Sequence, residues 1–320
     1  MIFWSTILYP EEILCYTTTN LSTHESQYAF KFGLQFYMRI YQQLIDFLPP
    51  LSSSKNEASG MITSYRVNRP QIENSERPAL VFLHGFNGSS KSWACQFAHF
   101  TSQTVIAIDA PGFGESQLVD GGMVAIADEV AALISSLVTG KAVIIGHSMG
   151  GMLAQVLGAT HPNICQAIIL SCTHKGRGRP VGSPLGAAVQ ERIQQREVMN
   201  DASYGALRVG KMLSGKIVPQ IMAFLAAVAG EIRVEGIRCG GFAMQYLDTS
   251  PFLDKITAPV AIFTGADDVV VKPDAAAALK AGLPQAHHWL LVDVGHAPYC
   301  EDAASFNAAV EAFLDAVLAG

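Results

Sequence analysis

The stretch AVIIGHSMGG, residues 142–151, decides the fold of this chain. It opens with four apolar residues, and an uninterrupted apolar run is typical of a strand that is covered on both faces of a sheet. Ser148 then stands between Gly146 and Gly150 in a G-x-S-x-G pattern. A serine in this pattern occupies a tight turn between strand and helix, where larger neighbours would collide with both elements. The stretch therefore predicts a strand, a raised serine hydroxyl and a helix in succession.

Further apolar runs repeat the strand signal along the chain, at 79–85, 104–110, 167–172, 259–266 and 288–293. Between and after them lie helical patterns, at 123–138, 152–160 and 303–319. Alternating strands and helices predict an α/β fold with a doubly wound, mostly parallel sheet. The interval from 174 to 253 has no strand signal, so we expect a helical insertion there.

Composition excludes several classes of function. The net charge is −6 and no run of Lys and Arg is present, which argues against a nucleic-acid partner. The six cysteines form no CxxC pair, so we expect a reducing, cytoplasmic location without a metal site. A membrane span needs about 20 apolar residues, and the longest apolar candidate, residues 221–230, is half as long. No GxGxxG follows a strand, so we expect no nucleotide cofactor.

The composition of the chain changes near residue 60. Residues 1–60 hold eleven of the 28 Phe, Trp and Tyr residues but only two Ala. Residues 48–60 are rich in Pro and Ser, as linkers are. We therefore expect residues 1–60 to be an N-terminal extension and residues 61–320 to be the main domain. One interpretation of this boundary is that the extension is not essential. A chain that begins at Met61 would then fold and be active.

A serine hydroxyl needs a base to remove its proton and a carboxylate to orient that base. His296 is the histidine that follows a late strand in a loop of small residues. Asp268 lies three residues past Gly265, at the end of another strand, and we favour it as the acid over Asp267. The sequence alone does not exclude Asp267 as the acid. The predicted catalytic triad is thus Ser148, Asp268 and His296.

Acyl transfer also needs an oxyanion hole, which we expect from the backbone N–H groups of Phe86 and Met149. We expect His84 and His147 to hold loops, Asp109 to cap a turn, and His174 either to touch substrate or to be solvated. Phe224, Phe242 and Met244 suit an apolar substrate pocket under the insertion, although each also suits ordinary core.

Residues 61–320 resemble the α/β-hydrolase family in five motifs that occur in the family's order. The motifs are VFLHGF, IAIDAPGFGES, VIIGHSMGG, FTGADDVVVKP and VGHAPYCEDAASFNAAVEAFL. The resemblance implies that residues 174–253 form a helical lid over the active site. The pair of motifs HGF and GHSMGG is similar to the corresponding motifs of cofactor-independent esterases and perhydrolases. Residues 240–265 are loosely similar to 3-oxoadipate enol-lactone hydrolases.

The resemblance implies a serine hydrolase that cleaves a small-molecule carboxylic ester, lactone or thioester through an acyl-enzyme, without cofactor or metal. Two alternatives use the same triad, namely a C–C bond hydrolase and a cofactor-free perhydrolase. A third alternative is a ligand-binding receptor on the same fold that retains slow hydrolysis.

Overall fold

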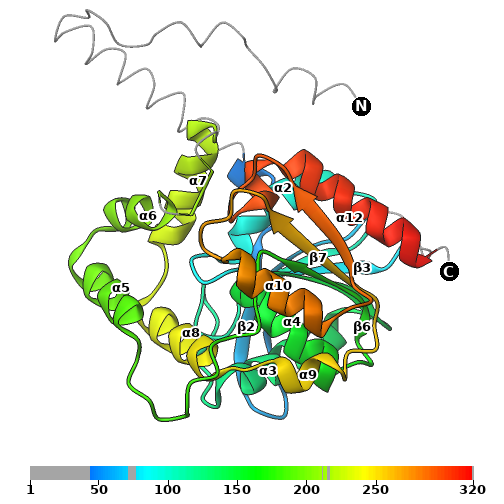
Figure 1. Ribbon diagram of the computed structural model, residues 1–320, viewed down its shortest axis with the longest axis horizontal. Coiled ribbons are helices and arrows are strands. Elements are labelled where there is room, and N and C mark those ends of the chain that lie inside the picture. The colour runs from blue at the N-terminus through cyan, green and yellow to red at the C-terminus, as the bar shows by residue number, and fades with distance from the viewer. Residues whose placement is uncertain (1–43, 71–76, 211, 215–216, 319–320) are drawn as a thin grey trace, which may run out of the picture. The chain divides into compact units, whose positions relative to one another are not determined.

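A single mixed sheet organises the part of the chain that the structure describes. The structure is a computed structural model, and it describes residues 44–70, 77–210, 212–214 and 217–318. Figure 1 shows this part of the chain as a ribbon. Within these residues the sheet has eight strands in the order β1-β2-β4-β3-β5-β6-β7-β8. The strands are β1 (Leu51–Lys55), β2 (Ile62–Asn68), β3 (Ala79–Leu83), β4 (Val105–Ile108), β5 (Ala142–His147), β6 (Cys165–Ser171), β7 (Val260–Gly265) and β8 (His287–Leu291).

The strands from β3 to β8 pair in parallel, and β5 lies at the centre between β3 and β6. Only the pairs β1–β2 and β2–β4 are antiparallel in this sheet. The six apolar runs of the sequence correspond to β3–β8, which confirms the predicted doubly wound, mostly parallel sheet.

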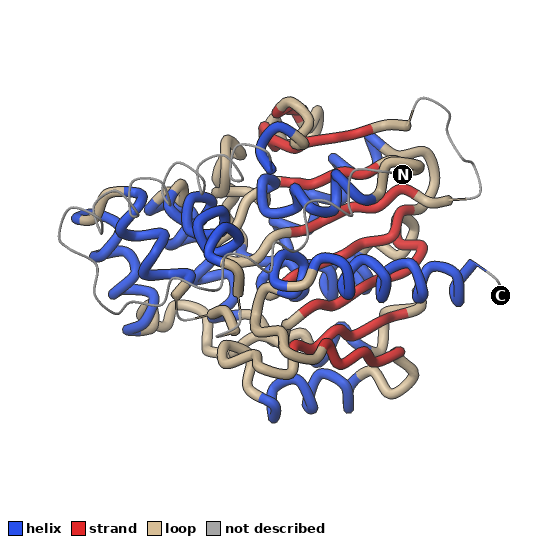
Figure 2. Tube along the Cα trace, turned by 90° about the horizontal axis from the view of Figure 1, so that it is seen from above, coloured by secondary structure: helices blue, strands red, loops and turns tan. Residues whose placement is uncertain are grey.

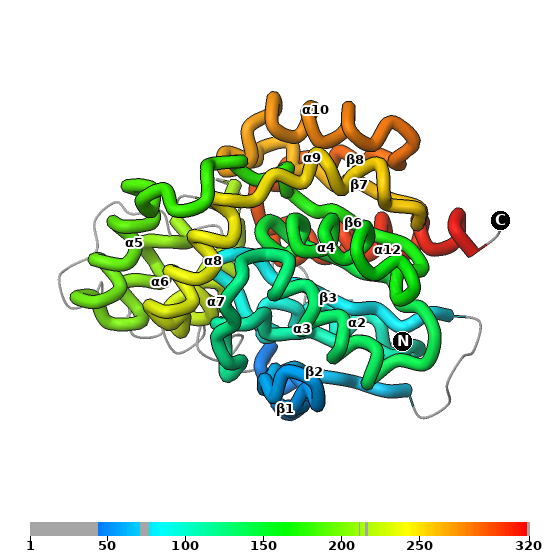
Figure 3. Tube along the Cα trace, turned by 90° about the horizontal axis from the view of Figure 1, so that it is seen from below, coloured from blue at the N-terminus to red at the C-terminus, as the bar shows by residue number. Residues whose placement is uncertain are grey.

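Alternate side chains of each strand enter two separate cores, because successive residues of a strand point to opposite faces. Ile144 belongs to the core that also contains residues of α3 (Gly122–Leu137), α4 (Met149–Thr160) and α10 (Pro273–Gly282). Val143 and Ile145 belong to the core of the other face, with residues of α2 (Ala94–His99) and α12 (Ala303–Leu318). Figure 2 shows α12 lying across one face of the sheet, and Figure 3 shows α3 and α4 over the opposite face.

The sheet begins ten residues earlier than the expected boundary at residue 61. Residues 51–55, which we assigned to a linker, form β1 and pair with β2 from Leu51 opposite Arg66 to Lys55 opposite Ile62. The sequence LSSSK carries no apolar run because β1 is an edge strand whose residues are exposed or half-buried. Residues 1–43 of the predicted extension lie outside the described residues.

Among the described residues, five helices follow β6 before the chain returns to the sheet at β7, as the absence of a strand signal predicted. They are α5 (Ala187–Val198), α6 (Asp201–Val209), α7 (Pro219–Gly230), α8 (Val234–Tyr246) and the short α9 (Ser250–Leu253). We call α5–α8 the insertion helices, and Figures 1 and 3 show them gathered to one side of the sheet. A Cβ atom on Gly240 of α8 would lie 3.0 Å from the Phe86 ring and 3.1 Å from the Met149 sulfur. The insertion helices therefore pack at the carboxyl ends of β3 and β5.

None of the described helices combines the length and the apolar character that a transmembrane helix requires. The apolar residues 221–230 belong to α7, which has 12 residues.

Candidate active site

Ser148 forms the turn between β5 and α4 in a backbone conformation that side chains rarely adopt. Its φ is 52° and its ψ is −112°, in the left-handed region that costs a non-glycine residue free energy. Its glycine neighbours allow the turn. A Cβ on Gly146 would lie 2.2 Å from the Gly150 carbonyl oxygen, and one on Gly150 would lie 2.2 Å from the Leu83 oxygen. The glycines of the G-x-S-x-G pattern thus allow α4 to pack closely on β5 and β3.

His296 joins Ser148 to Asp268 in one hydrogen-bonded chain. His296 Nε2 lies 3.1 Å from Ser148 Oγ, and His296 Nδ1 lies 2.9 Å from Asp268 Oδ2. The side chains of His296 and Asp268 are only 5% and 2% exposed. Three groups that are far apart in the sequence therefore meet at the carboxyl ends of β5, β7 and β8, where open α/β sheets bind ligands.

The environment of Asp268 favours its charged form. Burial acts to raise the pKa of Asp268, but the hydrogen bond and charge of His296 and two backbone N–H groups act against it, and the net pKa lies below its ordinary value. The N–H groups belong to Val270 and Val271 and donate to Asp268 Oδ1 at 2.8 and 3.0 Å. Asp267, the alternative acid, has an exposed side chain. The structure thus joins His296 to Asp268 and leaves Asp267 at the surface.

The two expected oxyanion donors flank the serine. Met149 is the first residue of α4, and the first N–H groups of a helix have no partner inside it. Phe86 follows Gly85, where a Cβ would lie 2.8 Å from the His147 ring and 3.3 Å from Ser148 Cβ. The loop that carries Phe86 therefore lies directly against the serine turn.

His84 holds a loop, in the role we expected, whereas Asp109, which we expected to cap a turn, bonds to segments distant in the sequence. His84 Nδ1 donates to the Gly85 carbonyl at 2.8 Å, while Nε2 accepts from the Ala110 N–H at 3.1 Å. Burial lowers the pKa of His84, in agreement with this neutral form. Asp109 accepts from the Ser90 N–H and the Ser64 hydroxyl at 2.6 and 2.7 Å.

His147 packs behind the candidate base. Its ring centroid lies 4.8 Å from that of His296 and 4.9 Å from that of Tyr299. Burial first, and then the charge of His296, lower the pKa of His147 well below its ordinary value. A neutral ring in this place supports the His296 imidazole without adding charge.

The three expected pocket residues are not equivalent. Phe224 has no exposed surface and belongs to the core of α7, so its assignment to the pocket is corrected. Phe242 and Met244 are half-buried on α8. The sequence could not separate them, because apolar side chains follow the same pattern in a core and in a pocket.

Glu301 is a site residue that the sequence analysis missed. Its carboxylate accepts from the N–H groups of Gly295, Ala297 and Ser214 at 3.0, 2.8 and 2.8 Å. The first two donors are the immediate neighbours of His296, so Glu301 fixes the loop that carries the candidate base. A carboxylate five residues after that histidine, in HAPYCE, was the available signal.

Cys172, Asp268 and His296 are the group of potential metal ligands found among the described residues. Asp268 and His296 already bond to each other. Burial, followed by the charge of Asp268, raises the pKa of the Cys172 thiol well above its usual range, which disfavours the thiolate that a metal ligand requires. The chemistry of this group fits a hydrogen-bonded dyad better than a metal site.

Known proteins share both sequence and fold with this chain. A family model described as the alpha/beta hydrolase fold matches residues 78–218. The bifunctional esterase/perhydrolase of Acinetobacter calcoaceticus is 30% identical over 216 residues, which cover 61% of this chain and 76% of that protein. The sn-1-specific diacylglycerol lipase of Mus musculus is 27% identical over 256 residues, which cover 74% and 81%.

The fold comparison gives the same result. The enol-lactonase of Burkholderia xenovorans matches with a TM-score of 0.71 and 21% identity, covering 82% of this chain and 99% of that structure. A thermophilic esterase of Thermogutta terrifontis matches with a TM-score of 0.70 and 22% identity, covering 84% and 99%. On these grounds the chain belongs to the alpha/beta hydrolase fold family.

Proposed function

We propose that this protein is a serine hydrolase that cleaves a carboxylic ester, lactone or thioester through an acyl-enzyme. One observation carries the proposal, namely the hydrogen-bonded chain from Ser148 Oγ through His296 to Asp268 at 3.1 and 2.9 Å. A nucleophile, a base and a group that orients the base are the minimum set for this chemistry.

In the proposed mechanism Ser148 Oγ attacks the carbonyl carbon while His296 Nε2 takes the hydroxyl proton. Asp268 accepts from His296 Nδ1, keeps the ring in the right tautomer and stabilises its positive charge. The Phe86 and Met149 N–H groups bind the oxyanion. His296 then gives its proton to the leaving group and activates the water that releases the acid and restores the serine.

A short p-nitrophenyl ester tests this proposal. We expect a burst of p-nitrophenol followed by steady turnover, and a fall in kcat of about 10⁶ for Ser148→Ala, as for the loss of other triad serines. Ser136→Ala is the control, because Ser136 is exposed on α3. Tight ligand binding without turnover in the wild type would instead favour the receptor alternative.

Perhydrolysis is a second candidate, which the 30% identity to an esterase/perhydrolase favours. Hydrogen peroxide would replace water in the last step, so that the acyl-enzyme yields a peracid and free Ser148. Peracid formation from acetate ester and hydrogen peroxide, lost in Ser148→Ala, would support it.

We also propose that residues 174–253 act as the lid of this site. The close approach of Gly240 on α8 to Phe86 and Met149 supports this assignment. Phe242 and Met244, half-buried on the same helix, remain the proposed pocket residues.

A further inference from the structure

Three arginines of the insertion form a group of like charges that act on one another. Arg177 follows β6, Arg192 lies on α5 and Arg208 lies on α6, and we call them the arginine cluster. None of the three forms an ion pair with another described residue. Charges that are removed from water without a partner are costly, and proteins pair them or use them to bind ligands.

The surroundings of Arg192 lower the pKa of its guanidinium group. Arg192 is half-buried, and burial first, then the charge of Arg208 and, more weakly, that of Arg177, lower the pKa of Arg192. The acidic side chain that acts on it, Glu191, is exposed and contributes least. Two positive charges thus act on Arg192, and the carboxylate of Glu191 compensates for them only weakly.

Arg192 also stands next to the candidate catalytic groups. Its Nη1 donates to Asn87 Oδ1 at 2.9 Å, and its guanidinium lies 5.1 Å from the centroid of the Phe86 ring. Asn87 and Phe86 belong to the loop of the oxyanion hole. That loop also approaches the base, since Asn87 Nδ2 lies 3.9 Å from the sulfur of Met212, whose carbonyl accepts from the His296 N–H at 3.0 Å.

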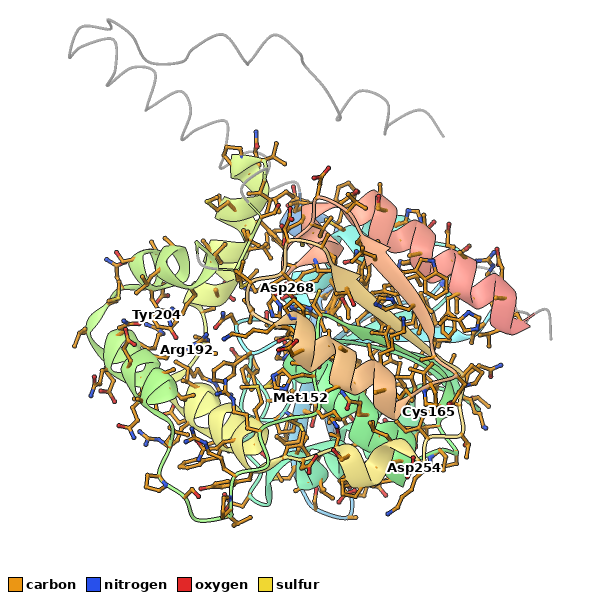
Figure 4. The ribbon with its side chains drawn as sticks, viewed as in Figure 1. Met152, Cys165, Arg192, Tyr204, Asp254 and Asp268 are labelled. Atoms are coloured by element: carbon orange, nitrogen blue, oxygen red, sulfur yellow. The ribbon has the colours of Figure 1, made fainter. Side chains whose placement is uncertain are left out.

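Two further observations bear on the position of the cluster, in which Arg192 and Arg208 are half-buried and Arg177 is exposed. After burial, the charges of Arg177 and His296 both act to lower the pKa of His174, so Arg177 and His296 lie near the same ring. The buried hydroxyl of Tyr204 and the buried Nε of Arg208 have no hydrogen-bond partner. Figure 4 shows Arg192 and Tyr204 on the side of the insertion helices that is turned toward the sheet and Asp268.

We propose that the ester cleaved at Ser148 carries a second, negatively charged group, a carboxylate or a phosphate, and that Arg192 binds this group together with Arg177 and Arg208. The inference rests on the proposed hydrolase function and adds the class of substrate. A planar guanidinium binds either anion through paired hydrogen bonds. Arg192 and Arg208 already donate to neutral acceptors, the side-chain oxygens of Asn87 and Gln195. The anion would add the negative charge that these acceptors do not supply.

Matched pairs of esters test the proposal. One pair is p-nitrophenyl hexanoate and mono-p-nitrophenyl adipate, and the other is dibutyrylglycerol and dibutyrylglycerol phosphate. The measured quantity is the ratio of kcat/KM for the anionic ester to that for its neutral partner, in the wild type, Arg192→Gln, Arg192→Lys and the control Arg238→Gln. Arg238 is exposed on α8. The glutamine keeps a donor for Asn87 but removes the charge, whereas the lysine keeps the charge.

We expect the wild type to prefer the anionic member of at least one pair. Arg192→Gln should lower that ratio by about 10- to 100-fold, the range that a hydrogen bond to a charged group contributes. Arg192→Lys should retain more of the ratio than Arg192→Gln, and Arg238→Gln should equal the wild type. The pair that shows the preference distinguishes a carboxylate substrate from a phosphate substrate.

A ratio near one in the wild type, or a ratio that Arg192→Gln leaves unchanged, would overturn the inference while serine-dependent hydrolysis of the neutral esters kept the proposed function intact. Absence of all ester cleavage would instead count against the proposed function. In that case calorimetric titration of Ser148→Ala with adipate and with glycerol 3-phosphate still decides the inference. Binding of either anion that weakens in the double variant with Arg192→Gln supports it. Absence of binding of both anions, or binding that Arg192→Gln leaves unchanged, overturns it.

Discussion

At the scale of single residues, Asp267 and Asp268 have different environments although they are neighbours. Asp268 accepts from His296 and from two backbone N–H groups, whereas the Asp267 side chain is exposed. Asp268→Asn should lower kcat by about 10⁴, because an amide favours the wrong tautomer of the imidazole. Steady-state kinetics on a p-nitrophenyl ester measures the effect. Asp267→Asn is the matched control, and an equal loss in that variant would contradict the assignment.

The lowered pKa of Asp268 also predicts how stability depends on pH. Below the ordinary aspartate pKa of about 3.9, the unfolded chain binds the proton while the folded protein does not. The contribution of Asp268 is therefore complete above that pH and is lost as the pH falls through the lowered pKa. Urea unfolding between about pH 5 and pH 3 should show a shallower loss of stability for Asp268→Asn than for the wild type. An unchanged slope would refute this.

At the scale of elements, the loop between β8 and α11 (Pro298–Glu301) depends on one carboxylate. Both oxygens of the Glu301 carboxylate accept hydrogen bonds, from the N–H groups of Gly295, Ala297 and Ser214. In Glu301→Gln an NH2 group, which is a donor, would replace one of these oxygens and face at least one of these N–H groups. The free energy of unfolding should fall by about 2 kcal/mol, as for other hydrogen bonds to charged groups. Displacement of His296 should also lower kcat by about 10²-fold. Chemical denaturation and kinetics test both, with Glu311→Gln, at the exposed end of an ion pair with His99, as the control that should change neither.

The elements that could be predicted from the sequence are those with local signals. The runs that became β3–β7 are apolar because both faces of each of these strands are covered. The edge strand β8 has a shorter apolar run, and its His287 and His288 are exposed. The polar β1 gave no such signal, and the packing of the insertion helices depends on contacts such as Arg192 with Asn87, which lie 105 residues apart. The hydrogen bond between Ser148 and His296 is also a contact between distant parts of the chain. The sequence therefore suggested the role of each residue, but only the structure gives the distance between them.

At the scale of the whole molecule, β1 forms one edge of the sheet. Because β1 belongs to the sheet, the main domain begins before residue 61, where the sequence placed its boundary. Besides the pairing of β1 with β2, the chain around β1 is tied to the body by Arg66 Nη1, which donates to the Pro49 carbonyl, and by Asn56 Nδ2, which donates to Glu129 Oε2 at 2.8 Å. Removal of residues 51–60 should therefore expose the β2 edge, and exposed edges favour aggregation.

Two truncated chains isolate this contribution, one that starts at Leu51 and one that starts at Met61. They differ only by β1 and the turn to β2, so any role of residues 1–50 cancels from the comparison. The chain from Met61 should unfold at a temperature about 5 °C lower, the shift that a loss of about 2 kcal/mol causes in a domain of this size, and should scatter more light on heating. Calorimetry of both proteins measures the difference. Equal midpoints would show that β1 adds nothing to stability and would return the domain boundary to residue 61.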